Sequence, residues 1–411
     1  RNFPMRVFRV AYLAVVASLL SGPAIAESPL LSKRISAGAL PPVTERLPET
    51  PMVTDLAAMG REMGQPGGDI SLLMARSKDT RMLTVYGYAR LVGFTPELTL
   101  QPDLALKIDN EGDQTFTLHL RPGHRWSDGQ PFTTEDFRYF WEDIALNEFL
   151  SPFGPPEALL VNNKPPRVEV IDRHTIRYHW PAPNPLFLPS LAGARPLYIY
   201  APGHYLKQFH AAYVEEEALK AMVEEAGVRN WAGLHTRYGH QYKFDNPDLP
   251  TLQPWLCVTP APSERFIFER NPYFHRVDTK GQQLPYLDRV IVNIASSGLI
   301  PAKTGAGESD LQGRYLRLDN YPFLMEGGER NNFVVRLWQM GVGSQMAIYP
   351  NLNANDDTWR ELMRDVRFRR ALSLGIDRDE INQVIYFGLV HPSANTVLPQ
   401  SPLFRQEYAD A

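Results

Sequence analysis

Residues 120–136 read LRPGHRWSDGQPFTTED, and this order of residue types predicts the end of a strand, two turns and the start of a helix. The alternating residues Phe116–Leu120 are typical of a half-buried strand. The Pro-Gly and Asp-Gly pairs that follow favour turns. Thr133 is a good helix N-cap, and Asp136 stands three residues further on. Trp126 lies between the turns, so we expect it to be the large side chain that this unit buries.

Strand and helix patterns are mixed along the rest of the chain, which predicts the mixed α/β class. A lead from Glu27 to Gly68 is rich in Pro and Gly, and we expect it to be poorly ordered. The expected strands are Asp69–Met74, Arg167–Ile171, Thr175–Trp180, Phe266–Arg270 and Val290–Ile294, with shorter strands at Trp338 and Met346–Asn353. The expected helices are Phe137–Ala145 and Tyr205–Ala226.

The last clear unit in the sequence is a pair of amphipathic helices. Small and apolar residues from Phe368 to Gly375 fall at the helical spacing i, i+3, i+4, i+7, and the residues from Ile381 to Gly388 repeat it. Asp377 is the expected N-cap of the second helix. The spacing therefore predicts two helices, each with one apolar face.

The N-terminus has the three parts of a secretory signal peptide. Arginines at positions 1, 6 and 9 precede the apolar run Val10–Leu20, and Ala24-Ile25-Ala26 is a small-x-small cleavage site. We therefore expect cleavage after Ala26 and export to the periplasm, with Glu27 as the first mature residue. The single cysteine, Cys257, lies far from this region, which argues against a lipid anchor.

Composition and motif searches exclude several classes of protein. The net charge of −4 shows no basic field, so we expect no nucleic-acid partner. The pairs His119/His124 and His174/His179 are each five residues apart, which places their side chains on opposite faces of a strand and makes a shared metal ion improbable. No hydrolase or phosphate-loop motif is complete. We expect no enzyme activity, cofactor or metal; a glycosidase stays open, because its two carboxylates need no fixed spacing.

Three stretches together resemble the family 5 extracellular solute-binding proteins, the dipeptide- and oligopeptide-binding type, of ABC importers. The first is residues 120–136. The second comprises Glu269–Phe274 and Leu284–Val290, and the third is Asp365–Arg378, while Gly307–Asp310 is similar to a shorter family motif. They stand in the order that the family has, from about Gly67 to the end.

The resemblance implies a two-lobed periplasmic binding protein fold of the large type with an extra subdomain. We expect the second lobe to be truncated at the C-terminus, because the family continues beyond the helix pair. The expected boundaries are 1–26 for the signal peptide, 27–75 for the first part of lobe I, 76–190 for the extra subdomain, 191–345 for the continuation of lobe I, and 346–411 for the crossover and the start of lobe II.

The implied function is delivery of an extended solute to the transmembrane subunits of an ABC permease. In this family two lobes close on the solute, which is typically a peptide. The stretch Asn320–Met325 resembles relatives that are associated with oligosaccharides, so both solute classes stay open. We expect a monomer.

The resemblance also implies a place for the solute. The family's crossover strand corresponds to Met346–Asn353, where alternation puts Tyr349, Asn351 and Asn353 on one face. One aromatic plane and two amides suit peptide bonds or sugar hydroxyls, and Trp338 would add a second plane. The alternative is that both Asn side chains only bind nearby backbone.

Most other motif residues are interpreted as scaffold. Trp126, Asp128, Thr133 and Arg378 fit turn, cap and packing roles. The arginines of the third stretch fit a solvated or salt-bridged helix face better than an anion site. These are Arg364, Arg367, Arg369 and Arg370.

Overall fold

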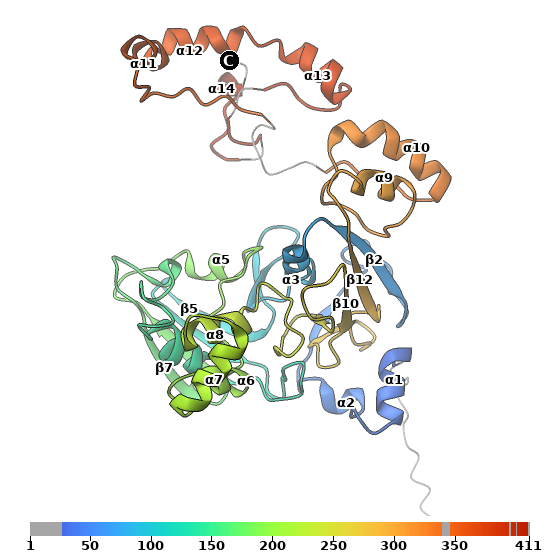
Figure 1. Ribbon diagram of the computed structural model, residues 1–411, viewed down its shortest axis with the longest axis vertical. Helices are drawn as coiled ribbons and strands as arrows, with labels where there is room; N and C mark the ends of the chain where they lie inside the picture. The colour runs from blue at the N-terminus through green and yellow to red at the C-terminus, as the bar shows by residue number, and fades with distance from the viewer. Residues whose placement is uncertain (1–26, 339–345, 394–395, 400, 410–411) are drawn as a thin grey trace, which may run out of the picture. The chain divides into compact units, whose positions relative to one another are not determined.

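The computed structural model describes residues 27–338, 346–393, 396–399 and 401–409 (Figure 1). The predicted signal peptide, residues 1–26, lies outside them. Contacts divide the chain into two units: the first is Arg1–Asp69 with Thr80–Ile291, and the second is Ile70–Asp79 with Val292–Ala411. Each unit is described by itself.

An antiparallel four-stranded sheet organises the first unit. Its strand order is β5-β6-β8-β7. The strands are β5 (Ala105–Glu111), β6 (Thr115–Leu120), β7 (Arg167–Asp172) and β8 (Thr175–His179). Phe116 of β6 lies opposite Tyr178 of β8, so their rings face the same side of the sheet. The predicted strands at Phe116–Leu120, Arg167–Ile171 and Thr175–Trp180 are therefore confirmed, and the last two pair with each other.

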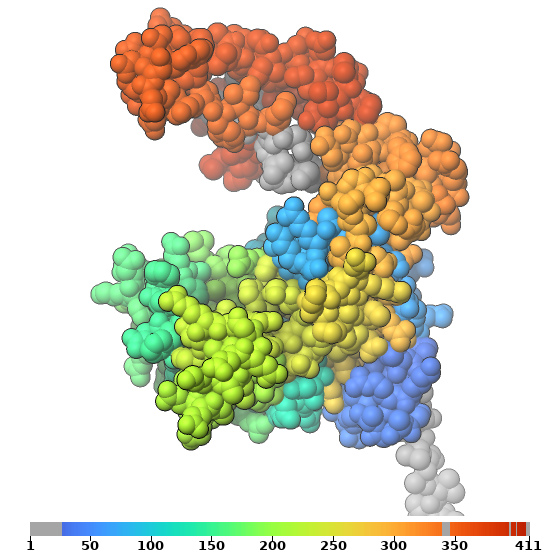
Figure 2. All heavy atoms as spheres, viewed as in Figure 1, coloured from blue at the N-terminus to red at the C-terminus, as the bar shows by residue number. Residues whose placement is uncertain are grey.

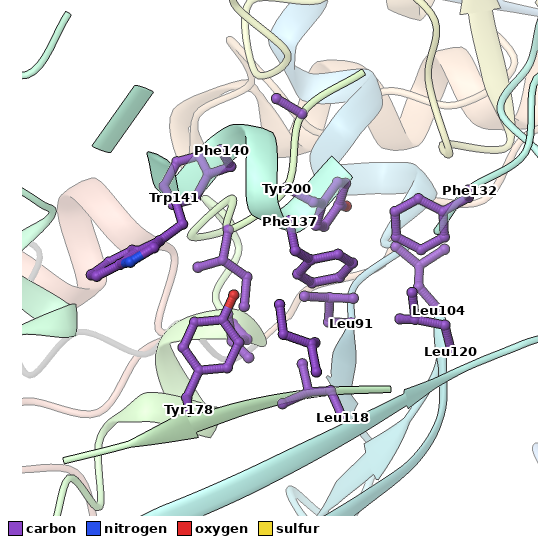
Figure 3. Packing of buried hydrophobic residues seen from close by; sticks show 14 of the residues in the cluster. Leu91, Leu104, Leu118, Leu120, Phe132, Phe137, Phe140, Trp141, Tyr178 and Tyr200 are labelled. Carbon is purple, nitrogen blue, oxygen red and sulfur yellow. The ribbon is translucent and has the colours of Figure 1, made fainter. Parts of the chain in front are cut away.

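The core of the first unit packs on this sheet and is unusually aromatic. Trp126 is fully buried, and its ring meets Phe132 edge to face with centroids 5.6 Å apart. Figure 3 shows Phe137, Phe132 and Tyr200 together, with the Tyr200 ring 5.5 Å from Phe137 and 5.3 Å from Phe132. Edge-to-face pairs add to the free energy of apolar burial, so this cluster fixes the strand–turn–helix unit of residues 120–136.

The sequence pattern predicts a single helix over Phe137–Ala145, but the structure forms two helical segments of different type. A capping box on Thr133 and Asp136 starts α4 (Thr134–Arg138), which continues as a π-helix, η2 (Tyr139–Ala145). The i→i+5 hydrogen bonds of a π-helix widen the turn. This geometry lets three successive aromatic residues, Tyr139 to Trp141, all be buried. The order of apolar and polar residues in the sequence does not distinguish a π-helix from an α-helix.

The lead from Glu27 to Gly68 is ordered, so its prediction as a poorly ordered segment is wrong. It contains α1 (Pro29–Ser36), α2 (Val43–Arg46) and β1 (Met52–Thr54), and β1 pairs in parallel with β11 (Arg276–Asp278). Leu31 and Arg46 are fully buried. Arg46 Nη1 donates to the Pro272 carbonyl at 2.8 Å, and Arg46 also pairs with Glu27. Long-range contacts of this kind leave no local pattern in the sequence.

The single helix predicted over Tyr205–Ala226 is interrupted. The chain forms α6 (Gly203–Leu206) and η4 (Lys207–Phe209), leaves the helix at His210 and resumes as α7 (Glu216–Ala226), which ends at Gly227. The imidazole Nδ1 of His210 accepts the Ala212 N–H at 3.1 Å, which stabilises the interruption. Figure 2, which draws the heavy atoms as spheres, shows the yellow-green residues of this region at the surface of the first unit.

The remaining elements of the first unit include η1 (Ser77–Arg81), which begins in the second unit, α3 (Met82–Gly87), β3 (Val92–Phe94), β4 (Leu100–Pro102), η3 (Glu157–Leu159), α5 (Phe187–Leu191), α8 (Trp231–Gly239), β9 (Trp255–Cys257) and β10 (Arg265–Arg270). The other four-stranded sheet has the order β2-β12-β10-β9, with β2 at Asp69–Met74 and β12 at Arg289–Ile294. The predicted strands at β2, β10 and β12 are confirmed.

The second unit is mostly helical. It contains α9 (Ile300–Gly305), η5 (Leu318–Asn320), α10 (Tyr321–Asn331), α11 (Asp357–Arg364), α12 (Val366–Leu374), α13 (Arg378–Tyr386) and α14 (Gln406–Ala409). The predicted helix pair is confirmed as α12 and α13. Asp377 caps α13 by accepting the Glu380 N–H at 2.8 Å. The apolar residues Leu372, Val384 and Ile385 on these helices are exposed.

Candidate functional site

The motif at residues 120–136 acts as scaffold in the structure. The carboxylate of Asp128 accepts the Gln130 N–H at 3.0 Å and lies 2.8 Å from His204 Nε2. Asp136 accepts the Thr133 N–H at 2.9 Å, and burial raises the pKa of its carboxyl group to about 7. These polar groups are used within the turn and the helix cap. The scaffold interpretation of Trp126, Asp128 and Thr133 therefore agrees with the contacts that they make.

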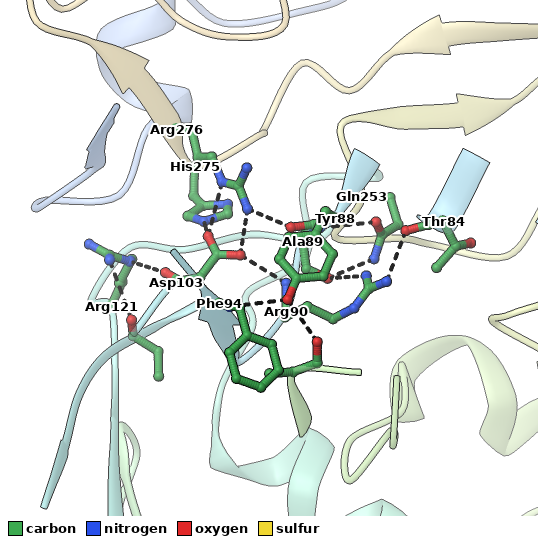
Figure 4. A network of polar contacts seen from close by, with 12 residues as sticks. Thr84, Tyr88, Ala89, Arg90, Phe94, Asp103, Arg121, Gln253, His275 and Arg276 are labelled. Carbon is green, nitrogen blue, oxygen red and sulfur yellow. Dashed lines mark hydrogen bonds and ion pairs between the residues drawn. The ribbon is translucent and has the colours of Figure 1, made fainter. Parts of the chain in front are cut away.

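A buried ionic network also has a structural role (Figure 4). Asp103 accepts hydrogen bonds from the Arg90 N–H at 2.8 Å, His275 Nε2 at 2.7 Å and Arg276 Nε at 3.0 Å. Burial alone would raise the pKa of Asp103, but Arg276 and His275 hold it well below its usual range. Arg121 joins the network by donating to the Asp103 carbonyl at 3.0 Å. The hydrogen-bond partners of the Asp103 carboxylate are all groups of the protein itself. The network therefore links the β3–β4 region to residues 275–276.

The short motif Gly307–Asp310 protects the edge of strand β2. Asp310 Oδ2 accepts the Ser71 N–H at 2.6 Å. The Gln312 amide accepts the Leu73 N–H at 3.0 Å and donates to the Leu73 carbonyl at 2.9 Å. The side chains of Asp310 and Gln312 thus form hydrogen bonds with the backbone of β2, as a neighbouring strand would. This motif is accounted for without a ligand.

The segment predicted as the crossover strand is not a strand. Residues 346–351 have no regular structure, and a turn follows at 352–353. Pro350 lacks an N–H, and no neighbouring strand pairs with this segment among the residues that the structure describes. Trp338, also predicted as a strand, has no regular structure either. Alternation therefore does not assign Tyr349, Asn351 and Asn353 to one face.

The four predicted solute residues are nevertheless at the surface. The exposed fraction is 83% for Trp338 and 82% for Tyr349. Asn351 and Asn353 are joined, because Asn351 Oδ1 accepts the Asn353 N–H at 3.0 Å. Residues 339–345, which lie outside the described residues, separate Trp338 from the other three. The exposed rings and amides can stack and form hydrogen bonds, and these four residues include no carboxylate, imidazole or thiol.

Arg364 of α11 also belongs to this group, although its sequence context predicts a solvated helix face. Its guanidinium donates to the Leu352 carbonyl at 2.7 Å and to Asn353 Oδ1 at 3.0 Å. The side-chain oxygen of Asn353 is therefore used by another side chain of the protein. The contact that fits the local-backbone alternative is the one between Asn351 Oδ1 and the Asn353 N–H. No spacing rule indicates the Arg364 contact, since a loop of irregular conformation joins its partners.

Three further arginines near the helix pair also bind locally. Arg369 donates to the Met363 carbonyl at 2.7 Å, and Arg378 to the Ser373 carbonyl at 2.8 Å. Arg367 pairs with Asp365, and this pairing lowers the pKa of Asp365 to about 2. These contacts support the interpretation of this arginine-rich stretch as a scaffold rather than an anion site.

The described residues offer neither a metal site nor a membrane-spanning helix. There, no group of three or more His, Cys, Asp or Glu side chains could hold a metal ion. His119 Nε2 lies 2.9 Å from Asp109, whereas His124 is buried elsewhere in the core. In the same part of the chain, no helix has the length and apolar character needed to cross a membrane.

Two curated relatives are similar to this chain. The periplasmic alpha-galactoside-binding protein of Rhizobium meliloti (strain 1021) is 25% identical over 399 residues, covering 87% of this chain and 52% of that protein. The periplasmic oligopeptide-binding protein OppA of Salmonella typhimurium (strain LT2) is 25% identical over 299 residues, covering 68% and 45% respectively. The chain thus spans about half the length of the curated relatives it matches.

Solved structures confirm the predicted fold class. An oligopeptide-binding protein OppA is 33% identical with a TM-score of 0.78, over 95% of this chain and 62% of that chain. The periplasmic binding protein MelB from Agrobacterium fabrum C58, in complex with stachyose, is 25% identical with a TM-score of 0.62, over 89% and 56%. The mixed α/β fold is therefore that of the two-lobed, OppA-type periplasmic binding proteins.

A family model accounts for most of the sequence. The model described as bacterial extracellular solute-binding proteins, family 5 Middle, matches residues 99–411. This match includes the stretches at residues 120–136, 269–290 and 365–378, which carry the resemblance in the sequence. The chain belongs to the bacterial extracellular solute-binding proteins, family 5.

Proposed function

We propose that this protein captures an extended solute and delivers it to the transmembrane subunits of an ABC-type permease. The observation that carries the proposal is the family match over residues 99–411. Family 5 members are binding proteins, and relatives along most of this chain are periplasmic solute-binding proteins. A solute that contacts two lobes stabilises their closed form, which the permease would recognise.

The proposed solute is an oligosaccharide or an oligopeptide. One relative is named for alpha-galactosides and another for oligopeptides, and a similar structure holds stachyose. The exposed rings of Trp338 and Tyr349 suit the flat faces of sugar rings. Arg364 donates to Leu352 and Asn353 in this group, and these neutral partners do not offset its positive charge, so both solute classes are kept in the proposal.

The proposed contact residues are Trp338, Tyr349, Asn351 and Asn353. Their exposure and hydrogen-bonding groups support the choice. The side-chain oxygen of Asn351 already accepts a hydrogen bond from the Asn353 N–H, which leaves its side-chain N–H groups for a solute. The proposed lobes keep the boundaries expected from the sequence, with residues 76–190 as the extra subdomain and the crossover from residue 346.

We also propose that the protein is exported, cleaved after Ala26 and free in the periplasm as a monomer without a lipid anchor. The charged, apolar and small-residue regions of residues 1–26 support export. The periplasmic relatives support the compartment.

Isothermal titration tests the proposal. We expect saturable heat with either stachyose or a mixture of short peptides, and unchanged solute when the solution is analysed afterwards. Products of hydrolysis would favour the rival class, a secreted glycosidase. The absence of binding to both solute types would contradict the proposed solute classes.

A further inference from the structure

A shallow surface groove of about 460 Å³ runs along one face of α8 in the first unit. Its small residues are Ala232 and Gly233, which keep this face of the helix low. The other lining residues are polar, cationic or aromatic: Phe149, Asn230, Thr236, Arg237, His240 and Lys243. The groove thus combines hydrogen-bond donors, two cations and one aromatic ring.

The groove carries positive charge. No Asp or Glu is among its lining residues. Arg237 is held in place by donating to the Ala226 carbonyl at the end of α7, and Lys243 Nζ lies 2.9 Å from Asp245, which offsets one of the two charges. His240 Nδ1 accepts the Lys243 N–H at 3.2 Å, so the neutral imidazole carries its proton on Nε2. A carboxylate in the groove would meet donors rather than acceptors.

Large apolar side chains project from the loop after the π-helix η2. Phe149, which lines the groove, is 61% exposed and contacts the Trp231 ring with centroids 5.9 Å apart. Leu146 is 53% exposed and Phe153 is 99% exposed. Three exposed apolar side chains thus occur within eight positions of one loop, and one of them, Phe149, lines the charged groove. π-Helical turns are frequent at functional sites, and this one leads directly into that loop.

We propose that the α8 groove and the loop Leu146–Phe153 form a docking surface for a segment of another protein that carries carboxylates next to an apolar side chain. The carboxylates would lie against Arg237, His240 and Lys243, and the apolar side chain against Phe149. Charge complementarity carries the choice of partner. An anionic lipid surface fits less well, because a bilayer is broad and would also meet the exposed glutamates of α7, which packs against α8, whereas a short segment contacts the groove alone; these glutamates are Glu216, Glu217, Glu224 and Glu225.

Site-specific photo-crosslinking tests the proposal in the cells that produce this protein. A benzophenone amino acid replaces Phe153, whose side chain makes almost no contact, in the full chain. We expect a protein adduct whose linked segment, identified by mass spectrometry, contains Asp or Glu next to an apolar residue. Arg237→Glu combined with Lys243→Glu should reduce the adduct at least tenfold, because the charges that attract the segment are reversed.

Lys33→Glu is the matched control, since Lys33 is exposed on α1 and does not line the groove. It should leave the adduct unchanged, and all variants should keep the wild-type melting temperature. The proposal is overturned by an adduct with lipid only, by an adduct with a second copy of this chain, by an adduct that survives charge reversal, or by no adduct above that of a probe placed at Lys33.

Discussion

Trp126 lies where the predicted turns meet the helix cap, and its burial is complete. Its ring contacts Phe132 and Tyr200, so removing it would leave a cavity among aromatic neighbours that cannot move independently. We expect Trp126→Ala to lower the free energy of unfolding by about 3–5 kcal/mol. Urea unfolding followed by circular dichroism measures this change.

Trp338→Ala is the matched control for Trp126→Ala. The Trp338 side chain is 83% exposed, so its removal should change the free energy of unfolding by less than about 0.5 kcal/mol. Equal stability of the two variants would show that Trp126 is not a core residue. Loss of solute affinity in Trp126→Ala without loss of stability would assign it to the binding site.

Asp103 is the second residue on which the first unit depends. It is buried and holds Arg90, His275 and Arg276 through the contacts of Figure 4. Asp103→Asn removes the charge that compensates the Arg276 guanidinium, so we expect a loss of about 3 kcal/mol of stability near pH 7. Asp109→Asn, in an exposed pair with Lys107, should stay close to wild type. The proposed role is wrong if both variants unfold alike.

The same carboxylate predicts acid sensitivity. The folded-state pKa of Asp103 is depressed, so its contribution to stability is complete above the unfolded-state pKa near 4 and is lost as the pH falls through the folded-state value. The wild type should therefore lose more stability between pH 5 and pH 3 than Asp103→Asn does. Parallel stability curves over this range would contradict the network.

At the scale of elements, the π-helix η2 and α8 are joined by a buried hydrogen bond between the Tyr139 hydroxyl and His235 Nε2 at 2.8 Å. Burial lowers the pKa of His235 to about 4. Because the unfolded chain takes up a proton near pH 6.5, the stabilisation from the neutral imidazole is complete above that pH. It is lost as the pH falls toward 4, and amounts to about 3 kcal/mol.

His235→Gln isolates this effect, because glutamine can keep a hydrogen bond to Tyr139 but does not titrate. Unfolding free energies at pH 7.5 and pH 4.5 should differ by about 2–3 kcal/mol less in His235→Gln than in the wild type. His179→Gln, at an exposed histidine, should keep the wild-type difference. Unchanged pH dependence in His235→Gln would place the acid sensitivity in other residues.

Elements with a local signal could be predicted from the sequence, and those set by distant contacts could not. The alternation at β6, the cap at Thr133 and the spacing in α12 are local, and all three are confirmed. The order of the lead depends on Arg46 binding the Pro272 carbonyl, 226 residues away. The predicted strand at Met346–Asn353 has an alternating pattern but no partner strand among the described residues, which shows that pattern alone does not make a strand.

At the scale of the whole molecule, the expected N-terminus of the mature protein is Glu27. Its carboxylate pairs with the buried Arg46, and Ser28 caps α1 by accepting the Leu31 N–H at 3.3 Å. Cleavage further along would remove these contacts and leave the Arg46 charge buried without Glu27. Mass spectrometry of the periplasmic protein should therefore find Glu27 first. A first residue beyond Ser28, or an intact segment 1–26 in a membrane fraction, would contradict the expected processing.

Solute binding is the prediction that concerns the molecule as a whole. Asn351 Oδ1 accepts the Asn353 N–H, so the Asn351 side-chain N–H groups are the part of the amide that a solute would use. Asn351→Asp keeps an acceptor for the turn but removes these donors. We expect it to weaken solute binding by about 1–3 kcal/mol, or about 5- to 150-fold in Kd, as measured by isothermal titration.

Tyr349→Ala should weaken binding to a similar extent through the loss of the exposed ring, since stacking on an aromatic face contributes about 1 kcal/mol or more. Asn355→Ala is the matched control: it removes an exposed amide from the same loop that was not assigned to the solute. Because the four side chains at positions 349, 351, 353 and 355 are exposed, the variants should have the melting temperature of the wild type, so a changed Kd reports on the solute and not on folding. Wild-type affinity in Asn351→Asp, Asn353→Ala and Tyr349→Ala alike would exclude this segment as the binding site while leaving the family and its fold untouched, because both rest on residues 99–411 as a whole.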